Sequence, residues 1–285
     1  MLVITGATGA LNGATVDRLL ERVPAQDIAV SVRDVTKAKR FADRGVAVRH
    51  GDYADPASLP AAFEGADQLL LVSSNDPSAD RVSLHRTAID AAVAAGVGRI
   101  LYTSHQGAGP DSPFRPARDH AATEQLLADS GVAWTSLRNG FYAHSLNWLM
   151  GPWRETDVIA VPGDGPVSWT AREDAAEAAA VILASNGAYD GPTTLTAGAA
   201  PTFDDLAATA SELTGRTVTC VVMNEDEWVA AQIAQGAQEI MAGFFLEFYQ
   251  AAQQGRFAGV DPLLGKLLGR EPRTPRDLLS QPTTQ

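Results

Sequence analysis

The chain has 285 residues, of which 45% are hydrophobic, and its formal net charge is −12 at pH 7. This length allows one large core, or one core with a smaller appended lobe. The negative charge argues against nucleic acid as a partner, because binding would have to overcome repulsion from the phosphates. The single cysteine, Cys220, excludes an intramolecular disulfide and a cysteine-based metal cluster.

No stretch of the sequence is apolar over enough residues to cross a bilayer, so we expect no membrane-spanning segment. The chain starts on an apolar, strand-like run, with no charged and then apolar targeting segment ahead of it. Together with the single cysteine, these features favour a cytoplasmic location.

A strand, a glycine-rich turn and a helix are predicted at the start of the chain. The apolar residues 1–4 lead into the turn, and a helix is expected over residues 14–22. Such a turn can hold a dinucleotide pyrophosphate, because glycine permits close approach of the phosphate and the helix N-terminus supplies unpaired N–H groups. The candidate cofactor-binding residues of this turn are Gly6, Thr8, Gly9, Ala10, Leu11 and Asn12.

Strand-like and helix-like segments then alternate. After the first strand, the pattern predicts strands at residues 28–32, 46–50, 67–72, 99–103 and 133–137. Between them it predicts helices at residues 35–44, 56–64, 79–95 and 117–129. Six strands alternating with helices indicate an α/β fold, a Rossmann-type doubly wound parallel sheet whose ligands bind at the carboxyl ends of the strands.

The rhythm changes after Gly140, where tryptophans appear among prolines and glycines, and we expect irregular structure over the sheet. Beyond it the pattern predicts helices at 172–184, 203–213 (with Thr202 as N-cap) and, largely, 225–254, and strands at 193–197 and 217–223. The tail from Pro272 is expected to be loosely held. We therefore predict a dinucleotide-binding Rossmann domain at 1–150 and a smaller α/β substrate-binding lobe at 151–285, with some chain returning to the Rossmann core.

An apolar cluster in the last long helical region could form a lid over the pocket, a dimer surface or core, and core is the default expectation. Its members are Phe244, Phe245, Leu246, Phe248 and Tyr249. No heptad or repeat indicates an oligomeric state, and a homodimer is compatible with the sequence.

Several short stretches in a fixed order suggest a family. They are Thr5-Gly6-Ala7-Thr8-Gly9, Val32-Arg33-Asp34 with Lys37-Ala38, Gly51-Asp52-Tyr53, Leu70-Leu71-Val72-Ser73-Ser74, Tyr102-Thr103-Ser104, His120 with Glu124, Leu137-Arg138-Asn139-Gly140-Phe141-Tyr142 and Thr170-Ala171-Arg172. Together they resemble the NmrA-like atypical short-chain dehydrogenase/reductases, particularly the NAD(P)H:quinone oxidoreductase and triphenylmethane reductase type. The C-terminal third resembles the family in outline only.

The resemblance implies further cofactor contacts at the strand ends. It places Asp52 and Tyr53 beside the adenine, Ser73 and Ser74 beside the ribose, and Thr103 and Ser104 near the nicotinamide. It also makes Asn139, Gly140 and Phe141 candidate cofactor-binding residues. The alternative is that the polar members are ordinary strand-end residues that satisfy turns.

The family usually has glycine at the position of Asn12, and Gly13 follows it here. Asn12 could shift the helix or place an amide near the pyrophosphate. Alternatively, Gly13 takes over the close-packing role with a small change of register.

The choice of cofactor depends on the end of the second strand. Arg33 can offer a guanidinium to a 2′-phosphate, which favours NADPH, although NADH remains possible. The alternative is that Arg33 is a solvated surface residue and Asp34 accepts the ribose hydroxyl.

The tyrosine–lysine pair of alcohol-oxidising short-chain dehydrogenases is missing. The only lysines are Lys37, Lys39 and Lys266, so neither Tyr102 nor Tyr142 has a lysine four residues later. A small planar aromatic substrate that accepts hydride without strong acid assistance, such as a quinone or a delocalised cation, fits better. The histidines show no two-histidine spacing for a metal, and we predict none.

His120 and Tyr142 are the catalytic candidates. His120 could donate a proton to a reduced quinone oxygen, but as a lone helical histidine it could equally be a surface or capping residue. Candidate substrate contacts are His105, Tyr142, Trp148 and Trp169. These features favour an NADPH-dependent oxidoreductase acting on quinones, with a non-catalytic redox sensor and an aromatic polyketide tailoring enzyme or oxygenase as alternatives.

Overall fold

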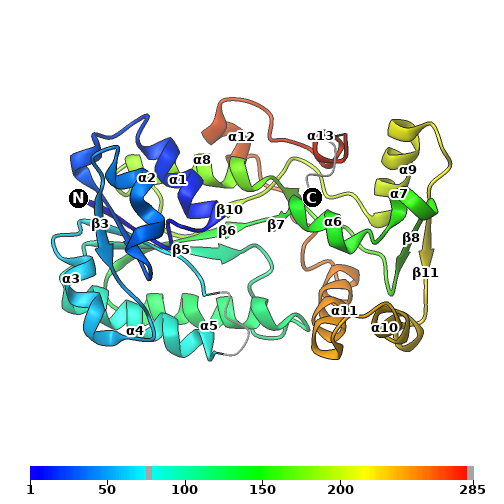
Figure 1. Ribbon diagram of the computed structural model, residues 1–285, viewed down its shortest axis with the longest axis horizontal. Helices are drawn as coiled ribbons and strands as arrows, with labels where there is room; N and C mark the ends of the chain where they lie inside the picture. Colours follow the sequence, from blue (N-terminus) through cyan, green and yellow to red (C-terminus); the bar gives the residue numbers. More distant parts are fainter. Residues whose placement is uncertain (75–78, 281–285) are drawn as a thin grey trace.

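Seven parallel strands form the central sheet of the computed structural model, which describes residues 1–74 and 79–280 (Figure 1). Their order across the sheet is β10-β6-β5-β4-β1-β2-β3. The strands are β1 (Leu2–Thr5), β2 (Ile28–Val32), β3 (Ala47–His50), β4 (Gln68–Leu71), β5 (Arg99–His105), β6 (Ala133–Asn139) and β10 (Gly191–Leu195). The expected Rossmann-type sheet is confirmed, and no helix of the described residues is long and apolar enough to span a bilayer.

The centre of the sheet is apolar on both faces. All residues of β1, β2 and β4 are buried, and Val3 pairs with Ala29 on one side and with Leu69 on the other. Continuous apolar runs of this kind are typical of parallel strands covered on both faces. The chain leaves β1 toward β2 and β3 on one side and returns to β4 on the other. The switch in direction therefore lies at β1, where open α/β sheets bind their ligands.

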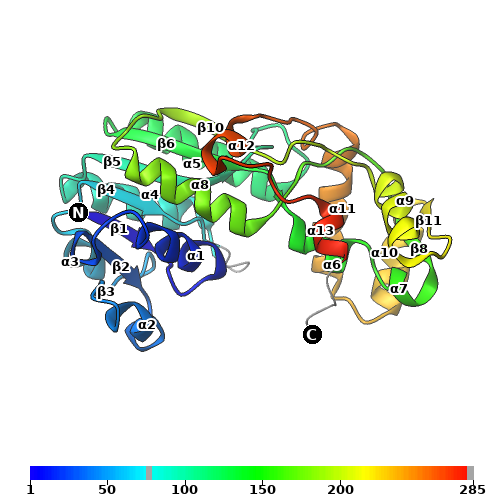
Figure 2. The ribbon, with the colours of Figure 1, turned by 90° about the horizontal axis from the view of Figure 1, so that it is seen from above.

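Helices cover both faces of the sheet. On one face lie α1 (Ala10–Leu19), α8 (Arg172–Ala184) and α12 (Leu263–Leu268), and on the other α3 (Leu59–Phe63), α4 (Arg81–Ala94) and α5 (Arg115–Asp129) (Figures 1 and 2). The helix expected at 35–44 is a 3-10 turn (Val35–Ala38) followed by one α-helical turn, α2 (Lys39–Ala42). Because β10 belongs to this sheet and α8 and α12 pack on it, much of the chain beyond residue 150 lies in the Rossmann unit.

A second lobe extends from the carboxyl end of the sheet (Figure 2). Its elements are β7 (Phe141–Tyr142), α6 (Leu146–Leu149), α7 (Trp153–Thr156), β8 (Val158–Val161), β9 (Trp169–Thr170), α9 (Phe203–Thr214), β11 (Thr219–Val222), α10 (Glu225–Ala234), α11 (Glu239–Gln253) and α13 (Pro275–Leu279). Short parallel pairs, β7 with β9 and β8 with β11, replace part of the irregular structure expected after Gly140.

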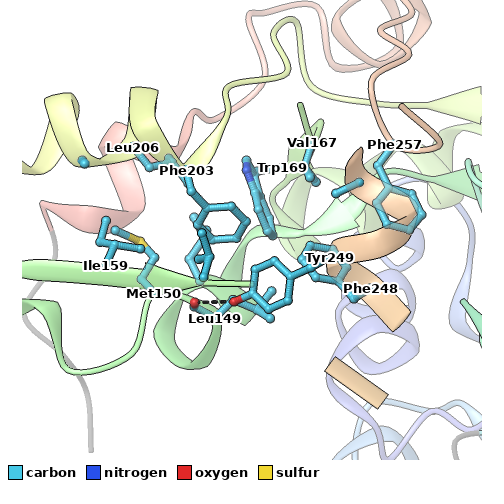
Figure 3. Close-up of a cluster of buried hydrophobic side chains, with 14 of the residues drawn as sticks. Leu149, Met150, Ile159, Val167, Trp169, Phe203, Leu206, Phe248, Tyr249 and Phe257 are labelled. Atoms are coloured by element: carbon cyan, nitrogen blue, oxygen red, sulfur yellow. Dashed lines mark hydrogen bonds between the residues drawn. The ribbon is translucent and has the colours of Figure 1, made fainter. Parts of the chain in front are cut away.

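The lobe has its own aromatic core (Figure 3). Trp169, Phe203, Phe248 and Tyr249 are buried within it, and the Tyr249 hydroxyl donates a hydrogen bond of 2.7 Å to the Leu149 carbonyl. The default expectation of core is thus confirmed for Phe248 and Tyr249 of the apolar helical cluster.

The expectation of a loosely held tail from Pro272 is wrong for the described residues. The side chains of Arg270 and Arg273 both pair with Asp174, which is completely buried in the first turn of α8. A capping box between Thr274 and Asp277 then starts α13. Charge pairing and capping fix the tail as far as residue 280, and the last five residues lie outside the described part.

Candidate functional site

The glycine-rich turn forms an open cradle at the N-terminus of α1. Gly6 has a φ of +62°, and a Cβ there would lie 2.6 Å from Val72 Cγ1, so this position requires glycine. Gly9 is the N-cap of α1, which has no side-chain cap and no acidic residue in its first turn. Thr8, Gly9 and Ala10 are exposed, and Leu11 is half-buried. The main-chain N–H groups at this helix end suit an anion.

Asn12 and Gly13 have different roles in this turn: one fixes the end of β1, and the other allows the helix to pack closely on the strand. The Asn12 amide is buried and donates a hydrogen bond of 2.8 Å to the Thr5 carbonyl, which fixes the end of β1 to α1. At Gly13, a Cβ would lie 2.9 Å from the Ala7 carbonyl oxygen. Gly13 therefore allows the close packing of helix on strand, and the Asn12 amide serves the protein's own backbone.

The end of β2 presents a cation. The Arg33 side chain is exposed. The neighbouring Asp34 carboxylate accepts hydrogen bonds from the Thr36 hydroxyl at 2.6 Å and the Thr36 N–H at 3.0 Å, and these bonds lower the pKa of Asp34. Oδ1 of Asp34 thus caps the following turn, whereas the Arg33 guanidinium is exposed.

Asp52 and Tyr53 support the site through the protein's own hydrogen bonds. Asp52 accepts the Ala54 N–H at 3.0 Å in a tight turn. The Tyr53 hydroxyl lies 2.6 Å from Thr5 Oγ1 and donates to the Val72 carbonyl at 3.1 Å, and burial raises the pKa of Tyr53. These bonds join the ends of β1 and β4 beneath the glycine turn.

A cavity of about 240 Å³ opens at the ends of β4 and β5. The Ser73 N–H donates to Thr103 Oγ1 at 2.8 Å and so ties the two strand ends together. The cavity is lined by Ser73, Ser74, Arg81, His85, Tyr102, Pro116, Asp119, His120 and Phe244. Arg81 pairs with Asp119 at 3.0 Å, so the two charged residues of the lining neutralise each other.

His120 is neither a surface nor a capping residue. Its Nδ1 lies 2.8 Å from the Tyr102 hydroxyl, and burial, followed by the nearby His105, His85 and Arg81, lowers the pKa of His120 well below its ordinary value. Burial also raises the pKa of Tyr102. Both side chains are therefore neutral at physiological pH.

Ser104 is not among the residues that line this cavity. Its hydroxyl donates to Glu124 Oε1 at 2.7 Å, in a buried group where Ser136 also donates at 2.6 Å and Arg138 pairs with the carboxylate. The Ser104 hydroxyl is thus committed to α5, and its expected position near the nicotinamide stays a prediction. Thr103, its neighbour on the strand, points to the opposite face.

His105 lies behind His120, among aromatic rings. It stacks on His120 with ring centroids 6.2 Å apart and contacts Phe141 and Phe257 edge-on at 5.5 and 5.1 Å. Burial lowers the pKa of His105 to about 4. His105 is therefore neutral and, like Phe141, packs near the cavity without lining it.

Tyr142 does not line the cavity that holds His120. Its hydroxyl accepts a hydrogen bond of 3.2 Å from the buried Asn139 side chain, and burial raises the pKa of Tyr142 to about 12. A Cβ on Gly140 would overlap Thr170 Oγ1. The two catalytic candidates thus lie in different surroundings.

Trp148 on α6 is 64% exposed and packs its ring edge-on against His144.

Trp169 is not a substrate contact in this structure. It is completely buried in the aromatic core of the second lobe, where it packs on Phe203 and Phe248 (Figure 3). The Trp169 ring also packs edge-on against Phe141. Six cavity residues were not singled out as site residues from the sequence: Arg81, His85, Tyr102, Pro116, Asp119 and Phe244. Phe244 reaches the cavity from α11, more than a hundred residues away along the chain.

The cradle, the cation and the cavity follow one edge of the sheet. Since β2, β1, β4 and β5 are adjacent in this order, Arg33, the glycine turn, Ser73 and Thr103 succeed one another along their carboxyl ends. A cationic end, an anion-binding helix terminus and a neutral aromatic end fit the phosphates and the nicotinamide of a dinucleotide.

Comparison with known proteins agrees with this geometry. Residues 6–186 match a family model described as NAD(P)H-binding. The chain is 36% identical to quinone oxidoreductase 2 of Escherichia coli strain K12, over 96% of each protein. It is 32% identical to an NmrA-like family domain-containing oxidoreductase of Aspergillus flavus, over 98% of this chain and 94% of that protein. The structure of a Citrobacter triphenylmethane reductase complexed with NADP(H) superimposes with a TM-score of 0.89 at 33% identity, over 99% of each chain.

Proposed function

This chain belongs to the NmrA-like family of NAD(P)H-binding oxidoreductases, and we propose that it transfers hydride from NADPH to a quinone or a related planar aromatic acceptor. The observation that carries the proposal is the order of groups along the sheet edge. It leads from Arg33 at the end of β2, past the glycine turn, to the cavity at β4 and β5.

The residues at each end of this sheet edge support binding of NADPH with its 2′-phosphate at β2 and its nicotinamide at β4 and β5. Arg33 would hold the 2′-phosphate of NADPH, and the N-terminus of α1 would hold the pyrophosphate. When bound, NADPH supplies the hydride. The paired charges of the cavity and the nearby rings of Phe244, His105 and Phe141 suit a flat, neutral acceptor.

The chemistry needs little from the protein beyond alignment. A quinone that accepts hydride becomes a hydroquinone monoanion, which takes its proton from water. No tyrosine–lysine pair is needed for that step, and the residues present would orient the acceptor.

Steady-state oxidation of NADPH with a panel of quinones, run with and without oxygen, tests the proposal. We expect turnover that does not depend on oxygen, with hydroquinone formed in equal amount to the NADPH consumed. Oxygen consumption during turnover would favour a tailoring oxygenase. Tight NADPH binding without turnover of any quinone would overturn the proposal in favour of a redox sensor.

A further inference from the structure

Four elements place a continuous set of hydrogen bonds behind the cavity. It begins after β4, where the Ser74 N–H donates to Nε2 of His85 on α4 at 2.8 Å. This bond occupies the lone pair of Nε2. Burial also lowers the pKa of His85 to about 4, so the imidazole is neutral and carries its hydrogen on Nδ1.

Thr123 on α5 accepts that hydrogen. His85 Nδ1 lies 2.8 Å from Thr123 Oγ1, and the Thr123 hydroxyl donates its own hydrogen to the Asp119 carbonyl at 2.8 Å. The tautomer of His85 is therefore determined at both ring nitrogens. A His85 Nδ1–H cannot accept a hydrogen from the Tyr102 hydroxyl, which lies 3.5 Å away.

The Tyr102 hydroxyl then has two neighbours in the described chain that could accept its hydrogen, Nδ1 of His120 at 2.8 Å and the Thr123 hydroxyl. Thr123 Oγ1 already accepts from His85 and donates to the Asp119 carbonyl, which leaves the lone pair of His120 Nδ1 as the unoccupied acceptor. Because burial keeps Tyr102 protonated, its hydroxyl donates to that nitrogen. A neutral His120 that accepts at Nδ1 carries its hydrogen on Nε2. In residues 1–74 and 79–280, this Nε2 has no hydrogen-bond partner, and His120 lines the cavity.

We propose that Tyr102 is a positioning residue, which holds His120 as the Nε2–H tautomer so that the imidazole presents a neutral hydrogen-bond donor to the acceptor oxygen. This inference rests on the proposed function, since the oxygen is that of the quinone. The backbone N–H of Ser74 and the side chains of His85 and Thr123 direct the Tyr102 hydroxyl toward His120.

The donor would act on the charge that hydride transfer creates. Once the quinone carries the hydride and its electron pair, negative charge develops on oxygen, and the Nε2–H group stabilises it without giving up the proton. The proton comes from water. Because a quinone ring delocalises this charge, the donor is expected to contribute about tenfold in kcat, less than a donor to a localised oxyanion.

The groups around His120 keep it neutral. Tyr102 and His105 face it from β5, His85 and Arg81 from α4, and Asp119 precedes it on α5. Arg81 is paired with Asp119, so no free carboxylate of the described residues favours the imidazolium.

Nuclear magnetic resonance of protein labelled with ¹⁵N-histidine tests the tautomer without any acceptor present. In the NADPH-bound enzyme we expect His120 to be protonated at Nε2 and unprotonated at Nδ1. In the Tyr102→Phe variant both tautomers should be populated. A wild-type His120 protonated at Nδ1 would overturn the proposal, whether or not the enzyme reduces quinones.

A double-mutant cycle separates positioning from packing. Glutamine at position 120 can place an amide N–H near the position of Nε2 without needing Tyr102, so His120→Gln should lose less kcat than His120→Ala. Tyr102→Phe should lower kcat about three- to tenfold in the wild type, with the Kd for NADPH unchanged. In the His120→Gln background it should lower kcat less than about twofold.

An equal loss of kcat in both backgrounds would show that Tyr102 only supports the fold, and the proposal would fail. Wild-type enzyme that reduces no quinone would instead refute the proposed function, while the tautomer measurement would still report on Tyr102.

Discussion

The two ends of the candidate site are built from different parts of the protein. At the nucleotide end, the exposed main chain of the glycine turn and one exposed side chain, Arg33, face the ligand. At the acceptor end, His120 is held by buried side chains from β5, α4 and α5, and Phe244 reaches it from α11. A substitution at the first end should therefore change binding alone, whereas one at the second should change stability or chemistry.

The substitution Gly9→Val should have the largest effect. A branched side chain there would block access to the N–H groups of α1, and we expect the Kd for NADPH to rise at least about a thousandfold. The φ of Gly9 is −81°, which valine can adopt, and a Cβ there would lie 3.3 Å from the Gly6 carbonyl oxygen, so the variant should fold with a small decrease in Tm. Fluorescence titration and thermal melting measure both, with Gly259→Val as the matched control because a Cβ there meets open space. A folded variant that still binds NADPH tightly would show that the turn is only structural.

The second largest effect should come from acid, which should lower the stability of the protein through the histidines at the acceptor end. Burial lowers the pKa of His85 and His105 to about 4, and that of His120 is lowered as well. The unfolded chain therefore binds more protons below pH 6.5, and stability present above that pH is lost as the pH falls toward 4. One pKa unit corresponds to about 1.4 kcal/mol, so the combined loss should be several kcal/mol.

Urea denaturation at several pH values measures this loss. The His120→Gln variant is the control. Glutamine cannot be protonated in place of His120, so this variant should lose less stability between pH 6.5 and 4.5. A free energy of unfolding that is constant over this range would contradict the lowered pKa values of these three histidines.

At the nucleotide end, Arg33→Ala should lower NADPH affinity about ten- to a hundredfold and leave NADH affinity nearly unchanged. A charge-assisted contact to the 2′-phosphate is worth roughly 1.5–3 kcal/mol. The measurement is titration of both cofactors against wild type and variant. An unchanged ratio of the two affinities in the variant would exclude Arg33 from cofactor selection.

Ser104→Ala should have a smaller effect, and on stability alone. It removes one hydrogen bond to the buried Glu124, which keeps Ser136 and Arg138, and we expect a loss of about 1–2 kcal/mol in the free energy of unfolding. The Kd for NADPH should not change. If the variant binds NADPH markedly more weakly at full stability, Ser104 contacts the cofactor after all.

The parts of the fold that local patterns determine were predictable. The buried strands β1, β2 and β4 are apolar runs, and the helix expected at 172–184 matches α8. The two-residue strands β7 and β9 are too short to show any periodicity. The tail was misjudged because its attachment depends on Asp174, about a hundred residues earlier in the chain.

The site divides in the same way. The glycine turn and Arg33 are local signals, whereas Phe244, His85 and Tyr102 have roles that only the tertiary contacts reveal. Because side chains alternate along a strand, the sequence already places the side chains of Thr103 and Ser104 on opposite faces of the sheet. Trp169 carried no local sign of its complete burial.

Anaerobic single turnover tests the central claim most directly, that NADPH bound along the sheet edge reduces an acceptor held beside His120. Enzyme loaded with NADPH is mixed with a naphthoquinone, and nicotinamide absorbance is followed for wild type, His120→Ala and Tyr142→Phe. We predict that one NADPH is oxidised per hydroquinone formed. In each variant the rate of NADPH oxidation should fall by no more than about tenfold, and the affinity for NADPH should not change. Wild-type enzyme that leaves its NADPH unoxidised would contradict the account, as would a loss beyond about a thousandfold in either variant, which would make that residue an essential proton donor.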